Sequence, residues 1–462
     1  MRQEYFFTDS QINQIRDGAI SILSEIGVKL GRRELVDKLA EKGFSTSGNF
    51  VRIDKKTALR KIESQKSGDT PPEKTGEKTL YAYSSHYANT YENIDGSFSE
   101  ITAESNAAMG RFVANAAKIW PNLGVACPGN PQDMRPELRF LRQKVNSLIW
   151  CENYWPFEFY SMKTTPYVMA LGEAAGRPIN GTAIYVGSPL NISGESFDIA
   201  LEYCDKFKWV GVSSMPSFGA STPLNLIAAY AQTLAETVGG AIIYEALTGV
   251  RASYSANLFP FDFYDMSLPF GTPENLLLQW TNKELAARIN GGEYWGPDSA
   301  DIHTNAPRCG IQACVEKASL SMAGAMLGAT RFIGCGTLAM DELFSPAQLL
   351  LDLEMLGHVE KIANGMPNEN FDGDLLAEVR GGLENSYILS DRTLDNMHGY
   401  IWKPSFFNRK SFGSYIKKPF PIEIEKAKVK AREIMNMPPV WKISDDLEIE
   451  LERIFEAAEK GV

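Results

Sequence analysis

Aromatic residues gather after two of the strands that the sequence predicts, at residues 252–256 and 293–295. They are Phe259, Phe261, Phe263, Tyr264, Tyr294 and Trp295. Ring faces carry partial negative charge and attract quaternary ammonium groups, by about 0.5 to 2 kcal/mol for each desolvated contact. As a group these rings predict a binding site for a methylated, positively charged amine. Any one ring taken alone is better explained by ordinary packing between loops and strands.

Two carboxylates are candidate catalytic residues because they lie in apolar surroundings. Glu236 lies within a predicted helix at 224–237, on a largely apolar side, and Glu245 follows a predicted strand at 241–244. A buried carboxylate in either place would face a cation or titrate with a shifted pKa. A helix-surface or capping role is the alternative for both.

His303 and Arg308 share one loop and are candidates to grip a substrate carboxylate, for which arginine offers bidentate geometry. An exposed loop arginine is the alternative for Arg308. Other chemistries find little support. No HxH or HExxH pair supplies a hydrolytic metal centre, and no glycine-rich loop opens a helix in a nucleotide-binding pattern. Ser188 is followed by Pro189, which cannot donate an oxyanion-hole amide.

Composition narrows the function classes. The 462 residues carry a net charge of −11 without a basic cluster, which disfavours nucleic acid and anionic membranes as partners. The apolar stretch 319–334 contains Arg331 and several glycines, so no transmembrane helix is expected. Acidic residues occupy the place of a signal peptide's apolar segment, which predicts a cytoplasmic protein with reduced cysteines. The spacing of Cys309 and Cys314 disfavours a zinc site.

Residues 123–365 alternate short apolar runs with helical stretches, which is typical of a parallel sheet built from βα units. Eight runs lie at residues 124–126, 157–160, 182–186, 209–213, 241–244, 252–256, 293–295 and 331–334. Eight units over about 240 residues fit an α/β fold of the (β/α)8 TIM barrel type, with a doubly wound sheet as the alternative. Residues 1–122 predict an N-terminal cap of helices, a hairpin and strands. Residues 366–462 predict a loop-rich stretch and then two helices, 422–435 and 445–458, packed on the barrel.

Several short motifs occur in the order and spacing of a known family. They are the helix at 15–28, Gly187-Ser188-Pro189-Leu190, Gly219-Ala220-Ser221-Thr222-Pro223-Leu224 followed by Ala235-Glu236, Thr272-Pro273-Glu274, and Gly328-Ala329-Thr330-Arg331-Phe332-Ile333-Gly334 followed by Asp352-Leu353-Glu354. Each motif is weak alone, but together they span nearly the whole chain. The chain resembles the trimethylamine methyltransferase family of corrinoid-dependent methyltransferases.

The resemblance implies a (β/α)8 barrel that passes a substrate methyl group to the Co(I) corrinoid, a cobalamin cofactor, of a separate partner protein. The trimethylamine enzymes of the family carry pyrrolysine, and a larger set without it demethylates glycine betaine, proline betaine or carnitine. This sequence has only the twenty standard residues and so resembles the second set. A quaternary amine suits that set, because its leaving group is already a neutral tertiary amine and needs no general acid.

The expected activity is therefore transfer of a methyl group from a quaternary amine of the glycine betaine kind to a corrinoid protein. Two other readings stay open: a barrel lyase or hydrolase that uses Glu236, Glu245, Asp298 and Asp301, and a non-catalytic binding protein for quaternary amines. Barrels of this size often form homo-oligomers. Asp391-Arg392-Thr393, with His398 five residues on, stands where many family members have a His-rich segment before a threonine.

Overall fold

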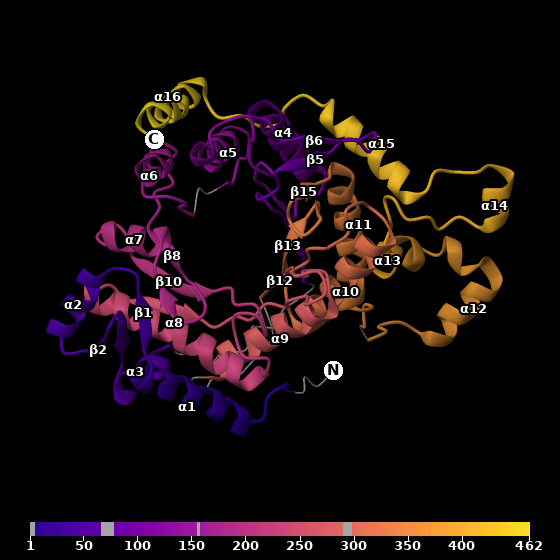
Figure 1. The fold of residues 1–462 in the computed structure, drawn as a ribbon. Helices are drawn as coiled ribbons and strands as arrows, with labels where there is room; N and C mark the ends of the chain where they lie inside the picture. The colour runs from indigo at the N-terminus through magenta and orange to yellow at the C-terminus, as the bar shows by residue number, and fades with distance from the viewer. Residues whose placement is uncertain (1–4, 66–77, 155–157, 290–297, 369) are drawn as a thin grey trace.

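The chain forms a mixed α/β fold in which most helices lie outside short parallel strands (Figure 1). The computed structural model describes residues 5–65, 78–154, 158–289, 298–368 and 370–462. Seven strands make up the parallel part: β4 (Tyr81–Ser84), β7 (Leu123–Gly124), β8 (Gly181–Val186), β10 (Trp209–Ser214), β11 (Ala252–Ser255), β12 (Ser299–Asp301) and β13 (Arg331–Cys335). They form two sheets, in the orders β8-β10-β11 and β7-β4-β13-β12. No hydrogen-bonded strand pair joins these two sheets in the described parts of the chain.

Several predicted strand positions are confirmed and others are corrected. The runs near 124, 182–186, 209–213, 252–256 and 331–334 are strands. The run at 241–244 is not a strand, because it lies inside a long buried helix, and a short apolar run cannot by itself distinguish the two. Residues 158–160 have no strand pairing, and the run at 293–295 lies outside the described residues. Two strands come from elsewhere: β4, N-terminal to the expected domain boundary at 123, and β12, whose polar Ser-Ala-Asp sequence gives no strand pattern.

Eight helices accompany the parallel strands. They are α4 (Ala103–Ile119), α5 (Pro136–Trp150), α6 (Thr165–Ala174), α7 (Glu195–Glu202), α8 (Leu226–Thr248), α9 (Pro273–Arg288), α10 (Ile311–Leu327) and α11 (Pro346–Asn364). The helix starts predicted at Pro273 and Pro346 are confirmed, since proline suits the first turn, where its missing N–H is not needed. Among the described helices, α8 alone has the length and hydropathy of a membrane span. Most of it is buried within this fold, where it packs against α1 and β10, so it is a core helix.

The N-terminal elements pack on this core. They are α1 (Asp9–Glu25), β1 (Val28–Leu30), α2 (Arg33–Glu41), β2 (Ser45–Ser47), β3 (Phe50–Arg52) and α3 (Lys55–Ser64). The predicted hairpin at 45–53 is confirmed as β2 and β3. β1 pairs with β3 and also, in parallel, with β9 (Asn191–Ile192), which follows β8. The N-terminal part of the chain therefore holds the segment that leaves the carboxyl end of β8.

Two small hairpins lie beyond the parallel strands. β5 (Thr90–Glu92) pairs with β6 (Phe98–Glu100), and β14 (Thr337–Leu338) pairs with β15 (Leu343–Phe344). β15 and β5 are joined in parallel, so the hairpins form one four-stranded sheet. It extends from the segments that follow β4 and β13.

The C-terminal segment is more helical than the sequence predicts. The two expected helices are present as α15 (Glu423–Met435) and α16 (Asp445–Gly461), which pack on α4 and α11, and on α5 and α6. The expected loop-rich stretch before them contains α12 (Leu375–Asn385), the 3-10 turn η1 (Tyr387–Leu389), α13 (Asp391–Tyr400) and α14 (Phe412–Lys417). None of these four elements has a buried residue. These elements therefore do not contribute to the core of the fold.

Candidate functional site

A partly buried carboxylate, with its side chain 20% exposed, has three hydrogen-bond partners beyond the carboxyl end of β4. Glu158 is 3.1 Å from Nε2 of His86 and accepts hydrogen bonds from the hydroxyls of Tyr87, at 3.0 Å, and Tyr160. His86 and Tyr87 follow β4 directly, whereas Glu158 and Tyr160 come from the segment before α6. These four residues are called the Glu158 cluster below. They bring together parts of the chain that lie more than 70 residues apart.

Further rings and a lysine surround the Glu158 cluster. Tyr160 stacks on Phe140 of α5 with ring centroids 3.7 Å apart, and the Nζ of Lys144, also on α5, lies 5.6 Å from the Tyr160 ring centroid. Tyr185, near the carboxyl end of β8, has a half-exposed side chain. Burial and the charge of Glu158 raise the pKa of the Tyr185 phenol. Tyr87 is also half-exposed. A ligand from solvent can therefore reach ring faces beside the carboxylate.

The electrostatics of the Glu158 cluster favour an ionised carboxylate. Burial raises the pKa of the Glu158 carboxyl, but His86, the Tyr160 hydroxyl and the charge of Lys144 outweigh burial and lower that pKa to about 2. Burial lowers the pKa of Lys144 to about 8, against the attraction of Glu158. Burial and the charge of Glu158 raise the pKa values of Tyr87 and Tyr160, which keeps both phenols protonated as donors. The Glu158 carboxylate is thus a negative charge held among aromatic rings, with the Lys144 ammonium as a neighbouring positive charge.

The backbone of Glu158 is also unusual. Its φ angle is +73°, in the left-handed region that residues other than glycine rarely adopt. Such a conformation costs roughly 1 to 3 kcal/mol and persists where surrounding contacts hold it. The three partners of the carboxylate supply such contacts. An anion with ring faces beside it can bind an organic cation through charge attraction and cation–π contacts.

The predicted aromatic site residues fall into separate places. Phe259 lies 6.4 Å from Phe270, and Phe270 lies 5.7 Å from His303, so these three rings form one chain at the carboxyl ends of β11 and β12. Phe261 and Phe263 contact each other at 5.1 Å. Tyr264 is 97% exposed and does not join this group. The predicted site residues Tyr294 and Trp295 lie outside the described residues.

Glu236 is fully buried and holds the turn that follows β8. It accepts hydrogen bonds from the Ser188 hydroxyl at 2.7 Å, from the Leu190 amide at 3.0 Å and from the Gln232 side chain at 2.8 Å. Burial raises the pKa of Glu236, while these three donors lower it. The geometry gives Glu236 a positioning role for residues 188–190.

Glu245 lies nine residues further along α8, roughly 13 Å away at 1.5 Å per residue. It pairs with Lys61 at 2.7 Å and accepts the Ala252 amide at the start of β11. This is the amino end of the parallel strand, whereas Glu236 contacts the turn after the carboxyl end of β8. The structure therefore does not bring the two predicted catalytic carboxylates into one site.

Arg308 is engaged by the β5–β6 hairpin. Its guanidinium donates to the Gly96 carbonyl at 2.9 Å, lies over the Phe98 ring at 4.3 Å and is 3.7 Å from Glu92. These contacts fix the position of the Arg308 guanidinium, although its side chain is half-exposed. The structure places Arg308 away from His303, although the two share a loop.

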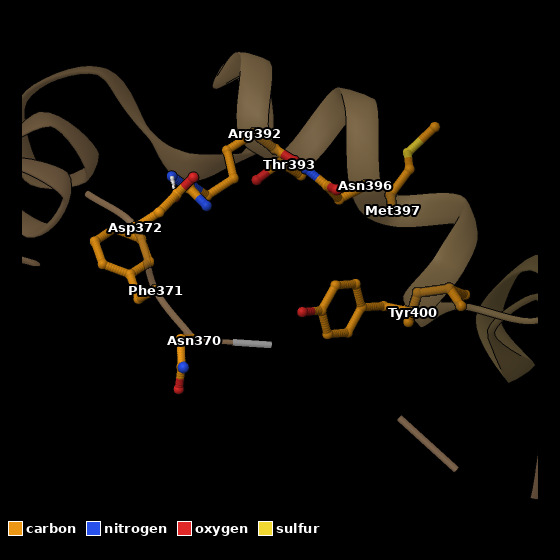
Figure 2. Close-up of a pocket in the computed structure, with 9 residues that line it drawn as sticks. Asn370, Phe371, Asp372, Arg392, Thr393, Asn396, Met397 and Tyr400 are labelled. Atoms are coloured by element: carbon orange, nitrogen blue, oxygen red, sulfur yellow. Dashed lines mark hydrogen bonds and ion pairs between the residues drawn. The ribbon is translucent and has the colours of Figure 1, made fainter. Parts of the chain in front are cut away.

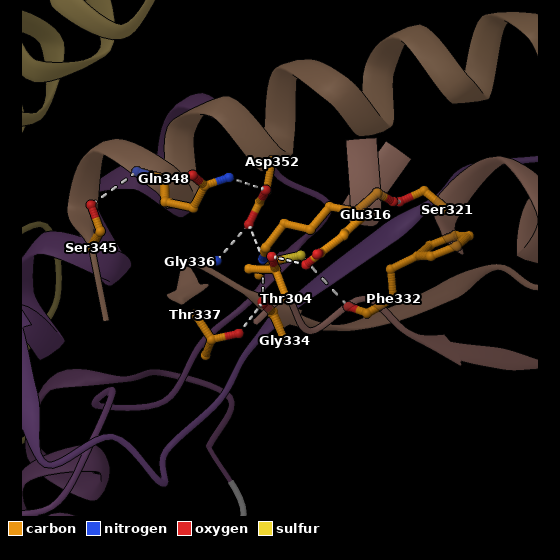
Figure 3. Close-up of polar contacts among 12 residues, drawn as sticks. Thr304, Glu316, Ser321, Phe332, Gly334, Gly336, Thr337, Ser345, Gln348 and Asp352 are labelled. Atoms are coloured by element: carbon orange, nitrogen blue, oxygen red, sulfur yellow. Dashed lines mark hydrogen bonds and ion pairs between the residues drawn. The ribbon is translucent and has the colours of Figure 1, made fainter. Parts of the chain in front are cut away.

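His303 packs against the backbone of β13, where a side-chain carbon added to Gly334 would lie 2.9 Å from the His303 ring. Behind Gly334 lies a buried ion pair: Lys317 of α10 donates to Asp352 of α11 at 2.8 Å, and neither side chain is exposed (Figure 3). Lys317 also donates to the Gly334 carbonyl at 2.8 Å, and Asp352 accepts the Gly336 amide at 2.7 Å. The pair fixes the irregular end of β13, where the register shifts between residues 333 and 335.

His303 gives a prediction about pH. Burial and the nearby Lys317 charge lower the pKa of His303 from 6.5 to about 3. The unfolded chain takes up this proton near pH 6.5, whereas the folded chain does so only near pH 3. The stability associated with neutral His303 is therefore fully present above pH 6.5 and is lost progressively as pH falls from 6.5 through about 3. The part of this loss between pH 6.5 and 4.5 is roughly 2 to 3 kcal/mol.

Urea unfolding at a series of pH values measures this effect. We expect His303→Leu to lose less stability over that interval than the native chain does. His398→Leu, at an exposed histidine of α13, is the matched control and should follow the native curve. Identical pH dependence of His303→Leu and the native chain would refute a buried neutral imidazole.

Sequence reasoning missed the Glu158 cluster. It treated residues 157–160 as a strand and counted His86 only among histidines without metal spacing. One signal was present: Glu158 is the sole charged residue of the aromatic run at 154–160, and a lone carboxylate among rings must find partners if it is buried. Two of the partners, His86 and Tyr87, could not be identified, because they lie more than 70 residues away in the sequence.

Comparisons with known proteins agree with the resemblance seen in the sequence. A family model described as trimethylamine methyltransferase (MTTB) matches residues 161–458, well over half of the chain, beginning just after Glu158. The trimethylamine methyltransferase MttB of Methanosarcina barkeri is 24% identical over 294 residues, which are 63% of this chain and 58% of that protein. The chain thus spans less than two thirds of that relative's length. MttB of Desulfitobacterium hafniense is 24% identical over 419 residues, covering 85% of this chain and 81% of that protein.

A solved structure is also similar. The crystal structure of the Methanosarcina barkeri monomethylamine methyltransferase covers 93% of this chain and 87% of its own, with 12% sequence identity and a TM-score of 0.40. Family membership rests on the family model. The chain belongs to the trimethylamine methyltransferase (MTTB) family.

Proposed function

We propose that the chain is a methyltransferase that takes a methyl group from a quaternary amine of the glycine betaine kind and delivers it to the Co(I) corrinoid of a separate protein. The observation that carries this proposal is the ionised Glu158 carboxylate held among the rings of Tyr87, Tyr160 and Phe140, with Tyr185 nearby. Family membership supports the reaction class. We infer that this site lies at the mouth of a barrel and acts in the cytoplasm.

The chemistry of the site suits a substrate that needs no proton. Glu158, with a pKa of about 2, is ionised at neutral pH and so is a counter-charge, not a general acid. The phenols of Tyr87 and Tyr160 point their protons at Glu158 and are occupied by it. A quaternary ammonium leaves as a neutral tertiary amine once its methyl is taken, so this site has only to hold and orient the cation. The reduced corrinoid supplies the nucleophile.

We also propose that the two parallel sheets are arcs of one (β/α)8 barrel, with 1–122 as cap, 123–365 as most of the barrel and 366–462 as extension. The chain order supports this: β4 and β7 precede residues 158–160, followed by β8, β10, β11, β12 and β13, and β13 pairs back to β4. In this proposed barrel, residues 158–160 occupy the eighth strand position, between β7 and β8. β4 is then the contribution of the N-terminal part to the barrel.

In this arrangement, site residues lie where barrel enzymes keep their catalytic groups, at the carboxyl ends of the strands. His86 follows β4, Tyr185 is near the end of β8 and His303 follows β12. We propose the Glu158 cluster as the main cation site and the rings of Phe259, Phe270 and His303 as further residues that line this site. Tyr294 and Trp295 remain proposed lining residues.

Mixing the purified chain with free cob(I)alamin tests the activity. Glycine betaine, carnitine, proline betaine and trimethylamine are offered separately, and the visible spectrum is followed. We expect the cob(I)alamin bands to be replaced by those of methylcob(III)alamin with at least one quaternary amine and not with trimethylamine. Mass spectrometry of the demethylated amine confirms the transfer.

Two outcomes would contradict the proposal. Tight binding of a quaternary amine without methyl transfer, both to free cobalamin and to a corrinoid protein, would favour a binding protein. Turnover of a small polar substrate without cobalamin would favour a lyase or hydrolase. A chain with Glu173→Gln, an exposed carboxylate of α6, serves as a control for handling and folding.

A further inference from the structure

The segment 370–421 extends from the body as a projecting arm (Figure 1). It has two lobes: the first, residues 370–400, contains α12, η1 and α13, and the second, residues 408–420, contains α14. Large apolar side chains cover these elements without a core of their own. Seven of them are between 65% and 80% exposed, namely Leu375, Leu376, Leu383, Ile388, Leu389, Phe412 and Ile416. Apolar exposure on this scale marks an interaction surface in a stable protein.

The arm is held in a fixed position by residues between its lobes. The Glu354 carboxylate of α11 accepts three backbone amides, those of Ser405, Phe406 and Phe407, at 2.9 to 3.0 Å. Phe406 is buried and stacks on Trp120. The lobes are therefore attached through a firm anchor, so their exposed faces have a defined orientation.

The first lobe carries a wide groove (Figure 2). Its volume is about 770 Å³, enough for several side chains, and its walls include Phe371, Arg392, Met397 and Tyr400. The Arg392 guanidinium lies 4.5 Å from the Phe371 ring centroid and pairs with Asp372 at 3.4 Å. Apolar side chains with an arginine and a tyrosine are typical of the centres of protein interfaces.

The lobes carry opposite charges. Residues 370–400 contain six acidic side chains and two arginines, a net charge of −4. Residues 408–420 contain four basic side chains and no acidic ones, a net charge of +4. Among the described ion pairs, those of Arg392 lie within the first lobe, and none joins the two lobes. Two copies related by a twofold axis would place each acidic lobe against the other copy's basic lobe, twice.

We propose that the arm is the surface through which the chain binds a second copy of itself. The exposed apolar residues and the groove supply the buried area, and the opposite charges of the lobes set the orientation of the two copies. This charge pattern favours a second copy over a partner of a single sign of charge. The proposal does not depend on the activity proposed above.

Light scattering coupled to size-exclusion chromatography tests the proposed dimer with the full chain. We expect a mass near twice 51.2 kDa at micromolar concentration, falling as salt is raised. Glu384→Lys with Asp395→Lys brings the net charge of the first lobe from −4 to 0, and Lys417→Glu with Lys418→Glu brings that of the second lobe from +4 to 0. Each double variant alone is expected to weaken the dimer by about tenfold or more.

Mixing the two double variants separates a broken interface from a damaged fold. In a heterodimer the unaltered acidic lobe of one variant meets the unaltered basic lobe of the other, a contact that neither variant can make with itself, so heterodimers are expected to form. Glu456→Lys with Glu459→Lys, on the exposed side of α16, is the matched control and should stay dimeric. A monomeric native chain would overturn the proposal. So would variants that stay dimeric, a mixture that fails to pair, or a native chain whose arm is protected only when a corrinoid protein is added.

Discussion

Glu158→Gln is expected to weaken the binding of a quaternary ammonium compound by about 2 to 5 kcal/mol, roughly 30-fold to a few thousandfold in Kd. The substitution removes the negative charge, and because Tyr87 and Tyr160 donate to different carboxylate oxygens, the single amide oxygen of glutamine keeps only one of these hydrogen bonds. A thermal unfolding curve that matches that of the native chain shows that the loss reports on charge and not on folding. Calorimetric titration with glycine betaine, carnitine and proline betaine measures it.

Two further variants separate charge from ring contact. Tyr185→Phe keeps the ring beside Glu158 and should bind as the native chain does, whereas Tyr185→Ala should lose about 0.5 to 2 kcal/mol. Glu173→Gln removes an exposed carboxylate of α6 and should leave the Kd unchanged. If Glu158→Gln binds with the native Kd and folds normally, the cation site lies elsewhere, and the chain of Phe259, Phe270 and His303 becomes the next candidate.

Lys317→Met is expected to lower the free energy of unfolding by about 3 to 5 kcal/mol. Asp352 would be left fully buried with its charge unpaired, and the Gly334 carbonyl would lose its lysine donor. Chemical denaturation at pH 7 measures the loss. Lys430→Met, in an exposed pair with Glu433 on α15, is the matched control and should change stability by less than about 1 kcal/mol.

A second substitution shows whether unpaired charge is the cause. Adding Asp352→Asn to Lys317→Met neutralises the remaining charge and keeps an acceptor for the Gly336 amide. The double variant should recover at least about 1 kcal/mol of the loss. A single variant within about 1 kcal/mol of the native chain, or a double variant no better than the single one, would contradict this account of the end of β13.

The sequence predicts the helices of this fold better than its strands. Proline in the first turn is a local signal, and α9 and α11 begin at such prolines. α15 and α16 begin within one residue of their predicted starts at 422 and 445. The run at 241–244 was wrongly predicted as a strand because burial on all sides makes a helix segment as uniformly apolar as an inner strand. β12 was missed because three residues with a serine and an aspartate carry no period.

The candidate site proposed from the structure has other members than the sequence indicated. Rings after the predicted strands were expected to hold a cation, with Glu236 and Glu245 as catalytic carboxylates, whereas in the structure an ionised carboxylate lies among rings at Glu158. Glu236 looks catalytic in sequence because it is buried, but its oxygens are taken by Ser188, Leu190 and Gln232. Only the folded structure shows which buried carboxylate already has hydrogen-bond donors from the chain itself. Burial alone therefore could not distinguish a positioning residue from a binding residue.

The pairing of β1 with β9 has a consequence for how the chain is made. Lys29 and Asn191 are direct neighbours, yet about 160 residues separate them in the sequence. At typical rates of 5–20 residues per second, β1 leaves the ribosome roughly 10 to 30 seconds before its partner. Throughout that interval the apolar side of α1, including Ile15 and Leu23, has no α8 to cover it. α1 therefore lacks its packing partner until α8 has been synthesised, and chaperones would bind its apolar side during that time.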